Sequence, residues 1–237
     1  MITKKTIDLN EVNFNEGAVI LINKPEGWSS FKVVDQVRRI LKVKKVGHGG
    51  TLDPKATGLL ILCTGKMTKR IEEFQNQFKE YHGKIFFGKN TPTMDMESID
   101  QASEEKDISF LTIDLIRQKA KEFIGIIEQT PPAYSAIWVN GKRAYKLARK
   151  GKEVNLTPRK VEILKFEIIE FNPPIAEFEL ICSKGTYVRS LVNDLGERLG
   201  CGAFLYQLIR TKIGDFDLED ALNIEELKKL IYKSSNQ

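Results

Sequence analysis

The chain of 237 residues has few of the side chains that build metal centres and disulfide frameworks. Its three cysteines, Cys63, Cys182 and Cys201, lie far apart without a CxxC pair, and its two histidines are His48 and His82. Disulfide scaffolds and zinc ribbons need clustered cysteines, and a catalytic zinc takes three protein ligands. We therefore expect neither a disulfide framework nor a metal site.

The sequence also lacks a long apolar run. No stretch approaches the roughly 20 residues that a membrane-spanning helix needs. The first residues, MITKKTIDLNEV, contain no apolar segment of a secretory signal. With 41% apolar and 29% charged residues the composition is that of an ordinary globular protein. We expect a cytoplasmic protein that does not contact a membrane.

The excess of basic residues is small but unevenly distributed. There are 37 lysines and arginines against 32 aspartates and glutamates, a net charge of +5. The basic segment Lys142–Lys152 contains no acid, and a second basic group occupies Arg38–Lys45. Such clusters can neutralise the phosphates of a nucleic acid. A solvated lysine-rich face has the same composition, so charge alone leaves both interpretations open.

Apolar patterns predict a mixture of strands and helices. Strands are expected at 18–22, 59–63, 81–87, 161–171, 176–182 and 204–209, and helices at about 66–76, 187–199 and from 223 onward. Asn172-Pro173-Pro174 and Asn140-Gly141 are turn sequences, each joining two strands. These connections are too short for parallel crossovers. The predicted fold class is α+β, with a mixed, largely antiparallel central sheet flanked by helices and loops.

Polar residues mark where three helices begin. Thr112 opens one helix, and Asn223 with Glu226 forms a capping box before the last. Ser29 or Ser30 caps another helix. The apolar face expected for that helix consists of Phe31, Val34, Val37 and Leu41.

The loop GHGGTLDPKATG, Gly47–Gly58, is the most informative segment. Its four glycines let the backbone approach a ligand closely. Asp53 precedes Pro54, which favours extended backbone at the aspartate. A phosphate-binding P-loop is excluded by the spacing to Gly65-Lys66 and by Met67, which stands where serine or threonine is required. Taken alone, Asp53 has two interpretations, a catalytic carboxylate and a turn cap.

Further segments combine with this loop in a fixed order. They are INKPEGWSS (22–30), Tyr81, GKNTPTMD (88–95), QTPPAYSA (129–136), CSKGTYVRSL (182–191) and LIRTKIGDF (208–216). In this order and over nearly the whole chain, the sequence resembles the TruB family of tRNA pseudouridine-55 synthases.

The resemblance implies a pseudouridine synthase fold and an isomerase that detaches uracil from its ribose, turns it and rejoins it through carbon 5. It assigns catalytic roles to Asp53, to Tyr81, whose ring stacks on the target base, and to Arg189, which pairs with the catalytic carboxylate. An ionised aspartate can attack the uracil ring or the anomeric carbon, or stabilise positive charge on the sugar. Since no electron is transferred, no cofactor is implied.

The resemblance also implies a flipped base and an RNA-binding surface. His48 takes the space of the flipped base, and Tyr187 lines the pocket. Asp95 contacts ribose or an arginine, or caps its own loop. Lys24 belongs to the substrate-binding set mainly as support for the loop. A basic insertion at about 126–155 grips the T-arm stem-loop of tRNA, the expected partner. Its binding residues are Lys142, Arg143, Lys146 and Arg149. No protein partner is implied, and we expect a monomer.

Residues 1–237 are expected to form one catalytic domain without the C-terminal PUA domain of many family members. Two other functions are compatible with parts of the sequence. One is a non-catalytic RNA-binding or tRNA-folding module that uses the basic insertion and His48. The other is a hydrolase with paired carboxylates, Asp53 and Asp95.

Overall fold

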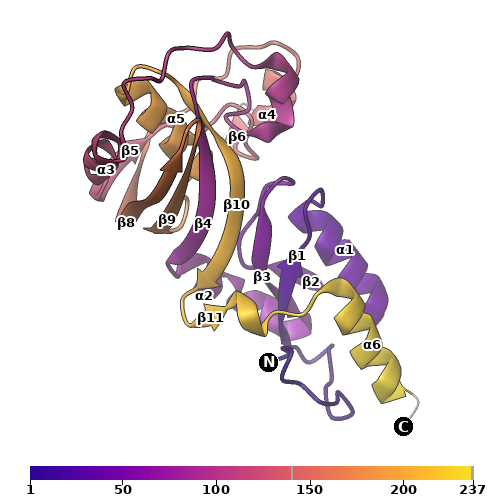
Figure 1. The fold of residues 1–237 in the computed structure, drawn as a ribbon. Coiled ribbons are helices and arrows are strands. Elements are labelled where there is room, and N and C mark those ends of the chain that lie inside the picture. The colour runs from indigo at the N-terminus through magenta and orange to yellow at the C-terminus, as the bar shows by residue number, and fades with distance from the viewer. Residues whose placement is uncertain (140, 236–237) are drawn as a thin grey trace. The chain divides into compact units, whose positions relative to one another are not determined.

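The computed structural model describes residues 1–139 and 141–235, which form two compact units (Figure 1). Unit 1 comprises Met1–Tyr81 and the chain from Leu208 onward, and unit 2 comprises His82–Gln207. The boundary falls within two strands, β4 (Lys79–Phe87) and β10 (Ala203–Ile213). Each unit therefore contains part of both strands.

The sheet of unit 1 is mixed. Its other strands are β1 (Val19–Lys24), β2 (Val46–His48), β3 (Thr57–Thr64) and β11 (Phe216–Asp217). β3 pairs antiparallel with β1 and β2 and parallel with β10, and β11 pairs antiparallel with β10. The predicted loop 47–58 is shorter than expected, because Gly47 and His48 belong to β2 and β3 already begins at Thr57.

Both faces of β1 and β3 are buried, which explains their nearly continuous apolar sequences. Ile20 and Leu62 belong to one core cluster together with residues of α1 (Ser30–Leu41) and α6 (Ile224–Ser235). Leu21 and Ile61, on the alternate positions, belong to a second cluster that includes Phe74. The strand predictions at 18–22 and 59–63 are confirmed.

The helix caps predicted in unit 1 are confirmed, but the apolar face predicted for α1 is only partly correct. Ser29 is the N-cap of α1, and Asn223 and Glu226 exchange the two hydrogen bonds of a capping box at 2.7 and 2.8 Å. The prediction that Phe31 lies on the buried face of α1 was wrong: its side chain is 72% exposed, and Val33 is buried instead. A residue two positions from Val33 lies on another side of the helix.

The sheet of unit 2 has the strand order β10-β4-β9-β8-β5. Its strands besides β4 and β10 are β5 (Gly125–Gln129), β8 (Arg159–Asn172) and β9 (Ile175–Cys182). The predicted hairpin at Asn172-Pro173-Pro174 is confirmed, with Phe171 opposite Ala176 and Ile163 opposite Cys182. β5, which pairs antiparallel with β8, was not predicted as a strand; it begins where the basic insertion was expected. Ile126 is 72% exposed, so β5 lacks a buried apolar run.

Two helices of unit 2 supply core residues next to β8 and β9. They are α3 (Ile113–Lys121), capped by Thr112 as predicted, and α5 (Val188–Arg198). The ring of Phe166 lies edge-on to Phe123, which follows α3, at 6.2 Å and to Phe178 of β9 at 5.6 Å. Ile124, which follows Phe123, is 50% exposed.

The remaining elements are short. A 3₁₀ helix η1 (Gly65–Arg70) and α2 (Ile71–Asn76) replace the single helix predicted at 66–76. Unit 1 also contains η3 (Leu218–Asp220) and unit 2 contains η2 (Met96–Gln101).

The basic segment lies on β7 (Lys142–Arg143), which pairs with β6 (Trp138–Val139), and on α4 (Ala144–Ala148). Asn140, half of the predicted turn, lies outside the described residues. In the described part of the chain, every helix is too short or too polar to cross a membrane.

Candidate active site

Asp53 occupies the first position of a tight turn in unit 1. Its carbonyl accepts a hydrogen bond from the backbone N–H of Ala56 at 3.1 Å, with Pro54 at the second position, where proline is favoured. The N–H of Gly27 donates to the carbonyl of Pro54 at 2.8 Å. Asp53 itself is half-buried. The turn thus fixes the backbone on which this carboxylate is carried.

Lys24, at the end of β1, supports this turn from inside the protein. The side chain is fully buried. Its ammonium donates to three backbone carbonyls, those of Pro25 (3.0 Å), Trp28 (2.6 Å) and Pro54 (3.3 Å). Burial lowers the pKa of Lys24 to about 8; the carboxylate of Asp53 opposes this shift, and the charge of Arg210 adds to it. Lys24 therefore stabilises the backbone of this loop, and its place in the substrate-binding set stays a prediction.

Arg210, on β10, is a second buried cation behind the same loop and is 1% exposed. Its guanidinium donates to the carbonyls of Leu59 (2.7 Å), Thr51 (3.4 Å) and Gly50 (3.2 Å). The pairing of β10 with β3 depends on Gly58, which has φ +103° and on which a Cβ atom would lie 2.3 Å from the carbonyl oxygen of Arg210. Arg210 thus joins both ends of the loop that contains Asp53.

Ser30 connects the loop to the start of α1. Its hydroxyl donates to the carbonyl of Leu52 at 3.1 Å and accepts from the N–H of Leu52 at 2.8 Å. The neighbouring Ser29 accepts from the N–H of Lys32 at 3.1 Å and caps the helix. Of the two serines that the sequence offered as caps, one is the cap and the other fixes the residue before Asp53.

The positions of Arg210 and of the Ser30 hydroxyl against the loop were not predicted from the sequence. Two features of the sequence could have indicated these positions. Arg210 follows Leu208 and Ile209 in a strand, so a buried position for its charge could be suspected. Two consecutive serines precede one helix, and only one of them can be its N-cap.

His48 is the last residue of β2, directly before the part of the loop that contains Asp53, and it is half-buried. Its Nδ1 accepts a hydrogen bond from the N–H of Gly50 at 3.3 Å. Burial, and secondarily the charge of Arg210, lower the pKa of His48. At neutral pH the uncharged form of the imidazole is therefore favoured.

In unit 2, Arg189 and Asp95 are both buried and lie close together. The Nε of Arg189 lies 3.6 Å from Oδ2 of Asp95, and its two terminal nitrogens donate to the carbonyls of Thr93 (2.9 Å) and Tyr134 (3.1 Å). The carboxylate of Asp95 also accepts from the Thr93 hydroxyl at 2.6 Å and from the N–H of Glu97 at 2.9 Å. Of the predicted partners for Asp95, the arginine is present, and Asp95 also caps η2.

Tyr187, directly before α5, is held by Gln129 at the end of β5. The buried amide of Gln129 accepts from the N–H of Tyr187 at 2.7 Å and donates to its carbonyl at 3.0 Å. The guanidinium of Arg159 lies 4.7 Å from the centroid of the Tyr187 ring. These contacts fix both the backbone and the ring of Tyr187.

The four predicted RNA-binding cations of the basic segment have different surroundings. Lys142 and Lys146 are exposed. Arg149 pairs with Glu97 at 3.0 Å, and Arg143 lies over the ring of Trp138. The two arginines are thus ordered by contacts within unit 2.

Tyr81 lies on β4, is half-buried, and is the last residue of unit 1 before the boundary. Asp53 also belongs to unit 1, whereas Arg189 belongs to unit 2. The predicted pairing of Arg189 with Asp53 stays a prediction.

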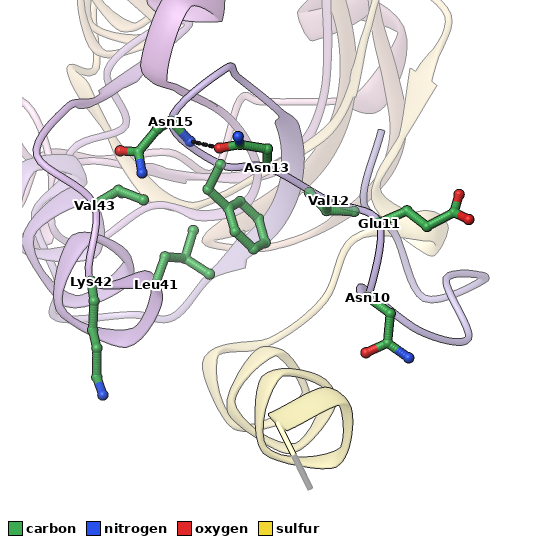
Figure 2. Close-up of a pocket in the computed structure, with 9 residues that line it drawn as sticks. Asn10, Glu11, Val12, Asn13, Asn15, Leu41, Lys42 and Val43 are labelled. Carbon is green, nitrogen blue, oxygen red and sulfur yellow. Dashed lines mark hydrogen bonds between the residues drawn. The ribbon is translucent and has the colours of Figure 1, made fainter. Parts of the chain in front are cut away.

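A cavity of about 400 Å³ in unit 1 contains none of the predicted site residues (Figure 2). Its lining residues are Asn10, Glu11, Val12, Asn13, Phe14, Asn15, Leu41, Lys42 and Val43. The N–H of Asn15 donates to Oδ1 of Asn13 at 3.0 Å, which closes the turn beside the cavity. With Glu11 as its single carboxylate, this lining offers no pair of carboxylates for acid–base catalysis.

Comparisons with known proteins cover both units. A model of the TruB family pseudouridylate synthase N-terminal domain matches residues 38–188, and a model of the tRNA pseudouridylate synthase B C-terminal domain matches residues 189–237. A protein of Bacteroides thetaiotaomicron named tRNA pseudouridine synthase B is 49% identical over 230 residues, covering 93% of this chain and 95% of its own. A protein of the same name from Clostridium tetani is 44% identical over 89% of this chain and 72% of its own.

Solved structures show the same fold. A chain from the crystal structure of a Cbf5-Nop10-Gar1 complex superposes with a TM-score of 0.72 at 30% identity, over 96% of this chain. The present chain spans 59% of the length of that structure's chain. Together with the mixed, largely antiparallel sheets and their helices, this similarity confirms the predicted α+β pseudouridine synthase fold. Because its two parts match the two models of one family in order, the chain belongs to the TruB family of pseudouridylate synthases.

Proposed function

We propose that this protein converts uridine to pseudouridine in tRNA, at uridine 55 of the T-loop. The observation that carries the proposal is the 49% identity to a tRNA pseudouridine synthase B over more than nine tenths of both chains. In the reaction the bond from N1 to the anomeric carbon breaks, the base turns, and a bond from C5 to that carbon forms. One proton leaves C5 and one is gained at N1. The reaction transfers no electrons, so we expect no cofactor.

The catalytic carboxylate in this proposal is that of Asp53. It attacks the base ring or the anomeric carbon, or it stabilises positive charge on the sugar. All three routes need an ionised carboxylate on a fixed backbone. The turn at Pro54, with the cations of Lys24 and Arg210 behind the loop, supports this role. Arg189 is proposed to pair with Asp53, and Tyr81 to stack on the base and to assist proton removal from C5.

The target base lies inside a folded RNA and must leave the stack to react. The uncharged, half-buried imidazole of His48 is proposed to occupy the space that the base leaves. Asp95 and Tyr187 are proposed to line the nucleotide pocket. The cations of the basic segment, with Lys142 and Lys146 exposed, are proposed to contact T-arm phosphates. We further propose that both units act as one catalytic domain, in a cytoplasmic monomer.

A T-arm stem-loop with tritium on C5 of the target uridine tests the proposal. The wild-type protein should release tritium to water and leave pseudouridine in the RNA. Asp53→Asn should abolish the release while RNA binding persists. Asp215→Asn, in the exposed turn between β10 and β11, removes a carboxylate elsewhere in unit 1 and should release tritium like the wild type.

The same assay separates the other functions. A non-catalytic RNA-binding module would bind the stem-loop and release no tritium, and its function would not depend on Asp53. A hydrolase that uses Asp53 and Asp95 would release free uracil without pseudouridine. Either result from the wild-type protein would refute the proposal, as would equal tritium release from Asp53→Asn.

A further inference from the structure

The hairpin of β6 and β7 presents an exposed indole ring. Trp138 is 61% exposed and lies opposite Arg143 in the register of the two strands. The guanidinium of Arg143 lies 4.4 Å from the centroid of the indole and also donates to the carbonyl of Ala136. The arginine therefore covers part of the ring and restrains it, while most of the side chain stays accessible.

Trp138 borders a cavity of about 430 Å³ in unit 2. This volume lies in the range of small-ligand pockets. Arg159 borders the same cavity and is held in place by two contacts, its position over the ring of Tyr187 and a hydrogen bond to the carbonyl of Gly185. Its Nε is buried and has no hydrogen-bond partner among residues 1–139 and 141–235. The cavity wall therefore contains a cation that these contacts hold in place.

The surroundings of this cavity favour a polyanion. The basic segment begins at Lys142, four residues after Trp138, and contains six cations and no acid. Asn155 and Thr157, which also line the cavity, provide neutral polar groups. A flat aromatic ring, a guanidinium donor and excess positive charge together are typical of sites for unpaired nucleotides.

We propose that this cavity binds one unpaired nucleotide of the RNA substrate. Its base stacks on the indole of Trp138, and the positive charge of Arg159 in the cavity wall attracts the phosphate of the same nucleotide. The inference rests on the proposed function, because it takes the RNA substrate from there. It adds a binding site distinct from that of the reacting uridine.

Binding of a labelled T-arm stem-loop by the full-length protein tests this site without requiring catalysis. Stacking of one base contributes about 1–3 kcal/mol, so Trp138→Ala should raise Kd by roughly 5- to 150-fold. Trp138→Phe keeps an aromatic ring and should restore most of the affinity. Tyr232→Ala removes an aromatic residue of α6 that is 73% exposed and serves as the matched control, with unchanged Kd.

A series of stem-loops, each lacking one base of the loop, identifies the contact. For the wild type, one of these abasic RNAs should bind more weakly; for Trp138→Ala, that same RNA should bind no worse than the intact one. A Kd within twofold of the wild type for Trp138→Ala would overturn the inference. So would a loss of affinity that is equal for all abasic RNAs, which would indicate a general effect on the surface. Failure of the proposed function is a separate result, namely RNA binding without tritium release by the wild type.

Discussion

Ser30 and Leu52 exchange two hydrogen bonds, in which one buried hydroxyl both donates to the carbonyl and accepts from the N–H of the residue before Asp53. Each buried backbone group left without a partner costs about 1–3 kcal/mol. Ser30→Ala should therefore lower the free energy of unfolding by a few kcal/mol and free the backbone next to Asp53, the proposed catalytic carboxylate. Because small misplacements of a reacting group lower rates strongly, we expect kcat to fall about tenfold or more.

Ser29→Ala is the matched control for this variant. It removes a hydroxyl from the adjacent residue, whose hydrogen bond caps α1 at the N–H of Lys32. Loss of a cap costs about 1 kcal/mol of stability, and kcat should stay within about twofold of the wild type. Urea denaturation of both variants measures the free energy of unfolding, and tritium-release kinetics measure kcat. Equal kcat values for the two would show that the contact with Leu52 does not position Asp53.

Arg210→Lys tests the second support of the loop. A lysine keeps the charge but cannot present the planar fork of a guanidinium to the carbonyls of Leu59, Thr51 and Gly50. We expect kcat to fall about 10- to 100-fold, because the backbone of the loop that carries Asp53 is held less firmly in place. The Kd for RNA should change little. Arg70→Lys, at an exposed arginine paired with Glu73 in the same unit, should leave both quantities unchanged. An Arg210→Lys protein that loses RNA affinity at full kcat would show that Arg210 acts on binding.

The elements that could be predicted from the sequence are those whose signals are local. The strand at Val19–Lys24, the capping box at Asn223 and the hairpin at Asn172 follow from apolar runs, cap residues and turn residues. β5 could not be predicted, since an edge strand with an exposed Ile126 gives no periodic signal. The exposed Phe31 shows the same limit, because which side of a helix is covered depends on the strands it packs against.

The candidate site also has features that could be predicted from the sequence and features that could not. The motifs predicted a catalytic Asp53 and a Lys24 that supports its loop, and the buried ammonium of Lys24 donates to three backbone carbonyls there. Arg210 lies about 150 residues further along the chain, and its role depends on the parallel pairing of Ile209 with Thr57. No local pattern encodes that pairing. Long-range support of a loop of this kind therefore becomes visible only in the folded chain.

The capping box of α6 should affect stability and not catalysis. Asn223→Ala removes the acceptor for the N–H of Glu226, and Glu226→Ala removes the acceptor for the N–H of Asn223. Each variant should lose about 0.5–2 kcal/mol of unfolding free energy. The double variant should lose less than the sum, because the two bonds belong to one motif. Strictly additive losses in chemical denaturation, or a lowered kcat, would contradict this account.

Lys24 should give stability and activity opposite dependences on pH. Its pKa is about 8 in the folded protein, against 10.5 as the ordinary value in the unfolded chain. Between pH 8 and 10.5 the unfolded chain therefore binds more protons at this residue, so the free energy of unfolding should rise with pH relative to that of Lys24→Met. Below pH 8 both states are protonated, and the difference between the two proteins should be constant.

Activity should change in the other direction over the same range. Below pH 8 the ammonium of Lys24 has three N–H donors for the carbonyls of Pro25, Trp28 and Pro54, whereas the neutral amine has two. The turn at Asp53 is then held less firmly, so kcat of the wild type should decline above pH 8. Lys24→Met should have a low kcat without this decline. Lys55→Met, at an exposed lysine two residues after Asp53, controls for the loss of one positive charge and should keep the wild-type profile. If wild type and Lys24→Met respond to pH in parallel in both measurements, Lys24 does not titrate in this range.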